Sequence, residues 1–330
     1  MQACCVNHAE VVFKGLLEKK EGVPSELQVF VNRILKDHSL FAKYIRMYAE
    51  VRVAILKKYV TAQATIYRCS NCEGDSTLII LSAPLLLLIW RISMLFMRGI
   101  NKWELNDKKL IVDFKSVDGA LKSEFKEMID EYLNGGERSF LTLSHEIEKV
   151  KEVPKVCLED FHYADVFANL WVMGHEVAHT ISEDKLSQVT SELLEIRKAT
   201  AKFVDLYDLY PSVAHEWEEE LNADLIALLL LYLTEAKRLK VDLEDVLVRE
   251  TIASKIAGGV ALACEAMYHI VRNVYPENTK DLNELKHPPL EIRWQVVKSY
   301  LMQISRPRAN VSIFYFADVI SRISFSFTDQ

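Results

Sequence analysis

The hydrophobic pattern of this chain is mainly that of a helical protein. Apolar residues recur at intervals of three and four over long stretches, and this spacing places them on one face of an α-helix. The pattern predicts helices over residues 7–67, 118–133, 160–181, 187–209 and 212–239. Two short apolar runs, 77–81 and 110–114, have the length of buried strands. We therefore expect helices to dominate, with a few strands between them.

Residues 77–97 form the most apolar segment, and this segment has two interpretations. As a membrane span it is short, because the stretch before Arg91 lacks the ~20 apolar residues that a transmembrane helix needs. An extension would bury Arg91 in the bilayer. In a folded domain the segment would instead form a strand and then a helix, with Ser82 as the cap and Pro84 in the first turn. Arg91 and Arg98 would then share one polar stripe of that helix. We predict the strand and helix, and a membrane anchor is the alternative.

Composition and charge narrow the class of protein. Half of the 330 residues are hydrophobic and 26% are charged, which is typical of a globular protein with a sizeable core. The formal net charge is −7, and the basic residues are scattered along the chain. This distribution argues against a nucleic-acid partner, because a nucleic-acid-binding protein concentrates its positive charge on one face.

Six cysteines are spread through the chain, and its first residues lack the basic and apolar regions of a signal peptide. We therefore expect reduced thiols and a cytoplasmic location. Cys69 and Cys72 could form half of a second zinc site, with Cys4 and Cys5 supplying the other half. A turn that carries two free thiols is the preferred interpretation.

The polar loop at residues 69–76 is the clearest break in the pattern. It predicts a boundary between an N-terminal helical region, residues 1–75, and a second domain, residues 76–330. We hypothesise that the N-terminal region gates the cleft of the second domain or recognises its substrate.

Residues 175–179 have the sequence HEVAH, an H-E-x-x-H pentad, inside the predicted helix 160–181. Residues four apart lie on one face of a helix, so His175 and His179 can bind the same metal ion. Glu176 then lies beside the metal, where it can accept a proton from the water that zinc activates. A catalytic zinc needs three protein ligands, so one ligand must come from elsewhere.

The third ligand is expected from an acidic stretch that begins the predicted helix 212–239. Its candidates are Glu216, Glu218, Glu219 and Glu220. Glu220 shares a helical face with Asp224 and with apolar residues further along, which suits a helix packed against a metal site. The other interpretation is solvated charge at a helix N-terminus, where acidic residues are favoured. Asp224 precedes a long apolar run and needs a buried partner, for which the free ring nitrogen of a metal-bound histidine is suitable.

These motifs resemble those of a known group of enzymes. Residues 220–224, ELNAD, match the E-x-x-A-D pattern that follows H-E-x-x-H in a branch of the gluzincin metallopeptidases. That branch includes the CAAX prenyl-protein proteases and the bacterial heat-shock membrane proteases. Residues 287–293, HPPLEIR, look like the H-P-P-x-x-x-R segment of the same families. The resemblance covers about residues 165–300. The membrane spans of those families are absent or reduced to residues 77–97, so the phage-exclusion peptidases of the Lit type are a closer soluble comparison.

The resemblance implies a role for each site residue. It implies one zinc ion on His175, His179 and Glu220, with Glu176 as the catalytic base. Asp224 would support a metal ligand. His287 would lie near the site and stabilise the oxyanion, although Tyr268 and Arg293 are alternatives for that task. The implied fold is α+β and predominantly α-helical, a zincin-like core with a small sheet and an active-site helix that carries the pentad.

The function implied is that of a zinc endopeptidase that hydrolyses an intracellular protein. The substrate would lie extended along a sheet edge, with residues 78–81 as a candidate strand. Two alternatives stay open: a membrane-anchored metalloprotease that uses residues 77–97, and a non-catalytic zinc-binding sensor or interaction protein. A structural zinc site does not need Glu176, and this residue therefore favours the enzyme.

Overall fold

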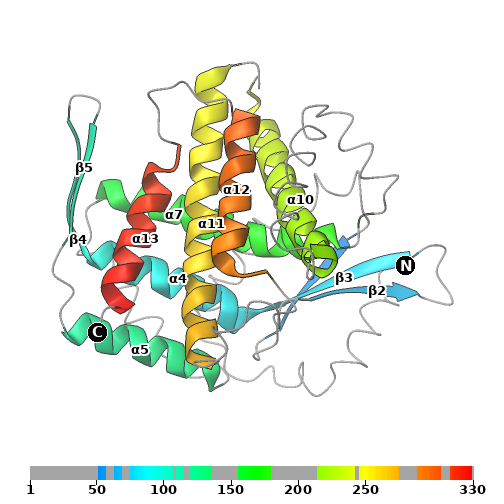
Figure 1. The fold of residues 1–330 in the computed structure, drawn as a ribbon, viewed down its shortest axis with the longest axis horizontal. Helices are drawn as coiled ribbons and strands as arrows, with labels where there is room; N and C mark the ends of the chain where they lie inside the picture. The colour runs from blue at the N-terminus through cyan, green and yellow to red at the C-terminus, as the bar shows by residue number, and fades with distance from the viewer. Residues whose placement is uncertain are drawn as a thin grey trace. The chain divides into compact units, whose positions relative to one another are not determined.

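The computed structural model describes part of the chain, shown in Figure 1. The described residues are 51–56, 63–68, 75–106, 109–114, 119–134, 155–179, 181, 214–241, 245–274, 288–305 and 313–328. The chain divides into two compact units. The first contains residues 1–162 and 323–330, and the second contains residues 163–322. The division predicted at residue 75 stays a prediction.

Among the described residues of the first unit, five strands form two separate sheets. Strand β3 (Asp75–Ser82) is central in a three-stranded sheet, parallel to β1 (Val51–Leu56) and antiparallel to β2 (Gln63–Arg68). Strands β4 (Ile100–Asn106) and β5 (Lys109–Phe114) form an antiparallel pair. The strands predicted at 77–81 and 110–114 are therefore confirmed.

The helix predicted over residues 7–67 is wrong where the structure describes that stretch, because β1 and β2 lie there. The sequence of β1, VRVAIL, is rich in β-branched residues, which favour strands, and it pairs with β3 along its whole length. Residues 7–50 lie outside the described residues.

Helix α4 (Ala83–Arg98) follows β3 directly, which confirms the predicted strand and helix. No helix in the described ranges is long and apolar enough to cross a membrane. The predicted polar stripe of α4 is also confirmed, since both of its arginines pair with α5 (Gly119–Leu133). Arg91 Nη1 lies 2.7 Å from Glu131 Oε2, and Arg98 Nη1 lies 2.7 Å from Glu124 Oε1.

The second unit is built on long helices. They are α7 (Lys155–Ala178), which begins in the first unit, α10 (Ala214–Leu239), α11 (Val246–Val274), α12 (Leu290–Ser305) and α13 (Tyr315–Thr328), which ends in the first unit. The predicted helices 118–133, 160–181 and 212–239 correspond to α5, α7 and α10, whereas 187–209 lies outside the described residues.

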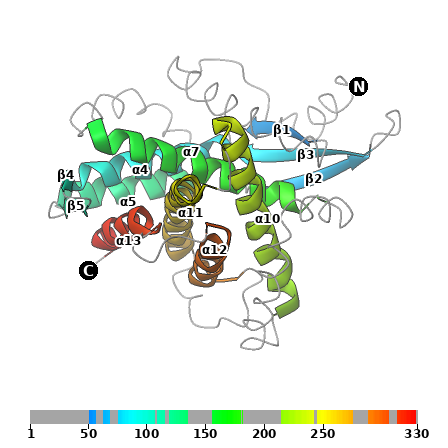
Figure 2. The same ribbon diagram turned by 90° about the horizontal axis from the view of Figure 1, so that it is seen from above.

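Helices α10, α11 and α12 lie side by side, with α11 antiparallel to the other two (Figure 1). Arg249, near the start of α11, donates to the carbonyl of Ser305 at the end of α12. Helix α7 crosses α11, and Figure 2 shows α11 nearly along its axis. The two helices meet closely at Gly259, where an added Cβ would lie 2.4 Å from Cβ of Phe167. A glycine is therefore required at this crossing.

The predicted fold class, an α+β zincin core with a small sheet, is wrong. Most of the described residues lie in helices, and the structure supports a helical class. The strands β1–β5 all belong to the first unit, whereas the pentad lies in the second, whose described residues form helices and turns. Within the second unit, the pentad helix packs against another helix, α11, at Gly259.

Candidate metal centre

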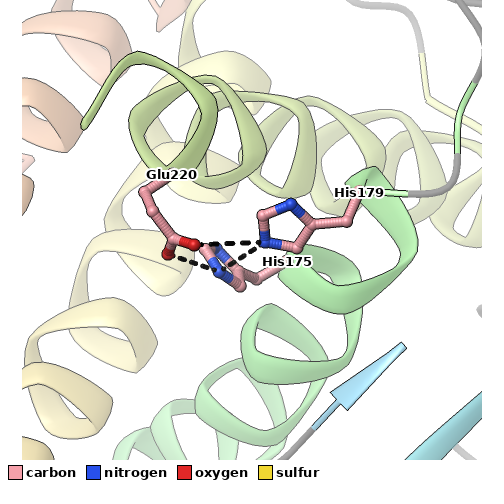
Figure 3. Close-up of side chains that lie close together, drawn as sticks. All are labelled: His175, His179 and Glu220. Atoms are coloured by element: carbon pink, nitrogen blue, oxygen red, sulfur yellow. Dashed lines mark hydrogen bonds and ion pairs between the residues drawn. The ribbon is translucent and has the colours of Figure 1, made fainter. Parts of the chain in front are cut away.

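Three side chains converge between the end of α7 and the beginning of α10. His175 lies in the last turn of α7, His179 follows directly after the end of that helix, and Glu220 lies in the second turn of α10. Figure 3 shows the three side chains pointing toward one another from these two helices. One ligand atom of each lies within 4.8 Å of the others, so the group could hold a metal ion.

The spacing of the two imidazole nitrogens and the Glu220 carboxylate fits a tetrahedral zinc ion. His175 Nε2 lies 3.2 Å from His179 Nε2 and 3.3 Å from Glu220 Oε2, while His179 Nε2 lies 3.6 Å from Glu220 Oε1. Ligands placed about 2.0–2.1 Å from a tetrahedral ion are about 3.3 Å apart. Two imidazoles and a carboxylate are also a donor set that zinc uses in catalytic sites.

Asp224 lies one turn after Glu220 on α10 and is fully buried. Its Oδ1 is 2.8 Å from Nδ1 of His175, which is the contact that the sequence predicted for this carboxylate. This bond leaves Nε2 as the nitrogen of His175 that faces the candidate metal position. A carboxylate on the far side of a ligand imidazole fixes its tautomer and ring orientation.

The charges around His175 favour its protonated form in the metal-free protein. Burial alone would lower the pKa of His175, but the hydrogen bond and the charge of Asp224 outweigh burial and raise this pKa to about 9. Burial likewise opposes ionisation of Asp224, yet Arg293 and His175 keep the pKa of this carboxyl below its usual range. A metal ion competes with the proton for Nε2, because a ligand imidazole must be neutral.

Arg293, in the first turn of α12, binds Asp224 with two hydrogen bonds. Its Nε donates to Oδ2 at 2.7 Å, and an Nη donates to Oδ1 at 2.5 Å. The guanidinium carbon lies 5.2 Å from the ring centroid of Trp171, one turn before His175 on α7. Three helices of the second unit thus meet behind the metal ligands.

The structure also places the remaining candidate residues. Glu176 follows His175 on α7 and is half-buried. Glu218 is exposed, and the exposed Glu219 has a carboxylate oxygen 3.5 Å from Nδ1 of His179. Tyr268 packs edge-on against His269 on α11. Neither Glu218 nor Glu219 is in the converging group.

Several predicted residues lie outside the described part of the chain. They are His287, the side chain of Glu216, and the cysteines Cys4, Cys5, Cys69 and Cys72. The oxyanion role of His287 and the second zinc site therefore stay predictions.

Sequence reasoning offered Arg293 only as an electrophile and missed its pairing with Asp224. The guanidinium is engaged by this carboxylate, 69 residues away in sequence. A signal did exist, because a buried carboxylate at the start of an apolar run requires a cation as well as a hydrogen-bond donor. Spacing alone could not say which of the basic residues supplies that cation.

Comparisons of the chain with protein-family models, with curated proteins and with solved structures found no match.

Proposed function

We propose that this protein is a zinc-dependent peptidase, in which His175, His179 and Glu220 bind the metal and Glu176 is the general base. The observation that carries the proposal is the convergence of two imidazole nitrogens, 3.2 Å apart, with the Glu220 carboxylate, whose oxygens lie 3.3 and 3.6 Å from them. Glu176 follows His175 on α7. Two imidazole ligands favour zinc over magnesium or calcium, which prefer oxygen ligands.

The chemistry divides between the metal and the chain. Zinc in such a site polarises the scissile carbonyl and lowers the pKa of its water to about 7. Glu176 would take the proton of the attacking water and pass it to the leaving amine. Asp224 would hold His175 in the tautomer that presents Nε2 to the metal. The peptide as substrate class rests on the resemblance of the H-E-x-x-H and E-x-x-A-D segments to the gluzincins.

The first test is the zinc content of the purified protein by elemental mass spectrometry. We expect about one zinc per chain in the wild type and a strong loss in Glu220→Ala, because three protein ligands hold a catalytic zinc. Glu218→Ala is the matched control, since it removes an exposed glutamate from the same turn of α10. Full zinc retention in Glu220→Ala, or equal loss in the control, would contradict the ligand assignment.

The second half of the test separates catalysis from metal binding. Glu176→Gln keeps the size of the side chain but cannot accept a proton. We expect this variant to keep its zinc and to lose peptide hydrolysis by about 10²-fold or more, measured by mass spectrometry on a mixture of unstructured peptides. Loss of zinc would indicate a structural role for Glu176, and wild-type turnover would exclude the general base.

A further inference from the structure

The second unit contains a buried arginine, Arg293, whose side chain contacts Asp224 and Trp171 and has an Nη 3.3 Å from Nδ1 of His175. The planar guanidinium of Arg293 binds both carboxylate oxygens of Asp224, and its carbon lies 5.2 Å from the Trp171 ring centroid. Arg293 is 8% exposed and Asp224 is 0% exposed. Both contacts therefore lie away from solvent, where they hold a single geometry.

Asp224 connects this arginine to a metal ligand. The same oxygen, Oδ1, accepts a hydrogen bond from Arg293 and lies 2.8 Å from Nδ1 of His175. Since Arg293 also binds Oδ2, the carboxylate cannot rotate about its axis without breaking a bond to the guanidinium. The orientation of the carboxylate fixes the direction in which Nε2 of His175 points.

We propose that Arg293 is a positioning residue for the metal: it orients Asp224, and through Asp224 it orients the ligand imidazole of His175. The inference rests on the proposed function, because it assumes that His175 binds a metal. Trp171 takes part by supporting the flat face of the guanidinium from the same helix that carries His175.

Positioning and simple charge neutralisation predict different behaviour. Charge neutralisation requires only a positive charge close to Asp224, which a lysine also supplies. Positioning, in contrast, requires an arginine, because the two parallel hydrogen bonds to Asp224 need the paired donors of a planar guanidinium, and lysine has neither the paired donors nor the flat face. We call this pair of donors the planar fork. Arg293→Lys keeps the charge and removes the fork, and it therefore distinguishes the two roles.

The experiment measures the zinc dissociation constant of the full chain by competition with a chromogenic chelator. We expect Arg293→Lys to raise this constant about 10- to 100-fold, the range found when a group that supports a metal ligand is lost. The control is Arg238→Lys, which removes a similar fork on Glu235 near the other end of α10. Arg238 is more exposed than Arg293, and we expect its replacement to change the constant less than about 2-fold.

Cobalt gives a readout that a general loss of stability does not mimic. Visible absorption of the Co²⁺-loaded protein depends on the ligand geometry, and we expect the bands to change in Arg293→Lys but not in Arg238→Lys. Unchanged zinc affinity and an unchanged cobalt spectrum in Arg293→Lys would overturn the positioning role and leave the proposed function intact. A wild-type protein without zinc binding would remove the proposed function itself and this inference with it.

A second variant keeps the test decisive if Arg293→Lys does not fold. Trp171→Phe leaves every charge in place and reduces the aromatic face near the guanidinium, at a buried ring whose centroid also lies 6.3 Å from that of His175. Circular dichroism of the metal-free protein checks its folding. We expect weaker zinc binding than in wild type by a few-fold, in proportion to the modest energy of such a stacking contact. Unchanged zinc affinity in a folded Trp171→Phe would contradict the inference.

Discussion

Arginine–carboxylate pairs join helices in both units. Arg91–Glu131 of the first unit is nearly as buried as Arg293–Asp224 of the second, with side chains 5% and 13% exposed, whereas Arg98–Glu124 is more exposed. Between α4 and α5 the side chains of Arg98 and Glu124 are 24% and 23% exposed. Between α12 and α10 the side chains of Arg293 and Asp224 are 10% and 0% exposed. Asp224 also contacts a histidine of the candidate metal centre.

The difference between Arg98–Glu124 and Arg293–Asp224 indicates separate roles for these two pairs. A partly exposed pair costs little desolvation and contributes little to stability. A fully buried pair costs several kcal/mol of desolvation for each ion, and apolar residues of the same volume often do as well. A contribution to stability alone therefore does not explain the presence of the Arg293–Asp224 pair. Its contact with His175 supplies a functional reason for retaining it.

The largest expected effect is that of Asp224→Ala. This change leaves the Arg293 guanidinium buried without its anionic partner, which typically destabilises a protein by about 3–5 kcal/mol. Urea unfolding of the metal-free protein, followed by circular dichroism, measures the change in the free energy of unfolding. Because the metal is absent, the loss cannot be attributed to zinc. A loss below about 1 kcal/mol would indicate that water or another group solvates Arg293, and the comparison of the two regions would then fail.

The second largest expected effect is that of zinc binding, which should stabilise the region of the candidate metal centre but not that of α4 and α5. At a free zinc concentration of 100 times the dissociation constant, a single site stabilises the folded state by about 2.7 kcal/mol. We expect hydrogen exchange to slow in the α7 and α10 segments around His175 and Glu220 and to stay unchanged in α4 and α5. Addition of excess chelator should reverse the protection. Equal protection of α4 and α5 would show that zinc stabilises both units together.

Some local elements of this chain could be predicted from its sequence, because their signals are local, whereas β1 and β2 were wrongly predicted as helix and β4, α12 and α13 were not predicted. The apolar spacing placed α5, α7 and α10 within a few residues, and Pro84 with Arg91 and Arg98 distinguished a buried helix from a membrane span. The helix at residues 246–274 was not singled out, although Ile252, Ile256 and Val260 recur at intervals of four and are all buried. Its spacing was as informative as that of the predicted helices.

The candidate site was predictable to the extent that its residues are close in sequence. His175, His179, Glu220 and Asp224 converge as the helical spacing predicted, because each pair sits on one face of one helix. The pairing of Arg293 with Asp224 depends on how α12 packs on α10, and no local pattern contains that packing. The sheet of the zincin core was inferred from the resemblance rather than from residues near the pentad. That inference failed because the resemblance covers motifs, and the motifs do not determine what packs behind their helix.

The smallest expected effect is that of Glu124→Gln, which removes the negative charge of the Arg98–Glu124 pair while it keeps the side-chain volume. Arg98 can turn toward water when its partner is neutral, since it is already 24% exposed. We expect a loss of no more than about 1 kcal/mol in the free energy of unfolding, together with unchanged zinc content. The same urea and elemental measurements check both values. Because the pair is partly screened by solvent, 0.5 M salt should reduce even this difference, whereas it should leave the effect of Asp224→Ala largely intact. A change in zinc content here would mean that α4 and α5 support the metal centre, which the comparison of the two regions denies.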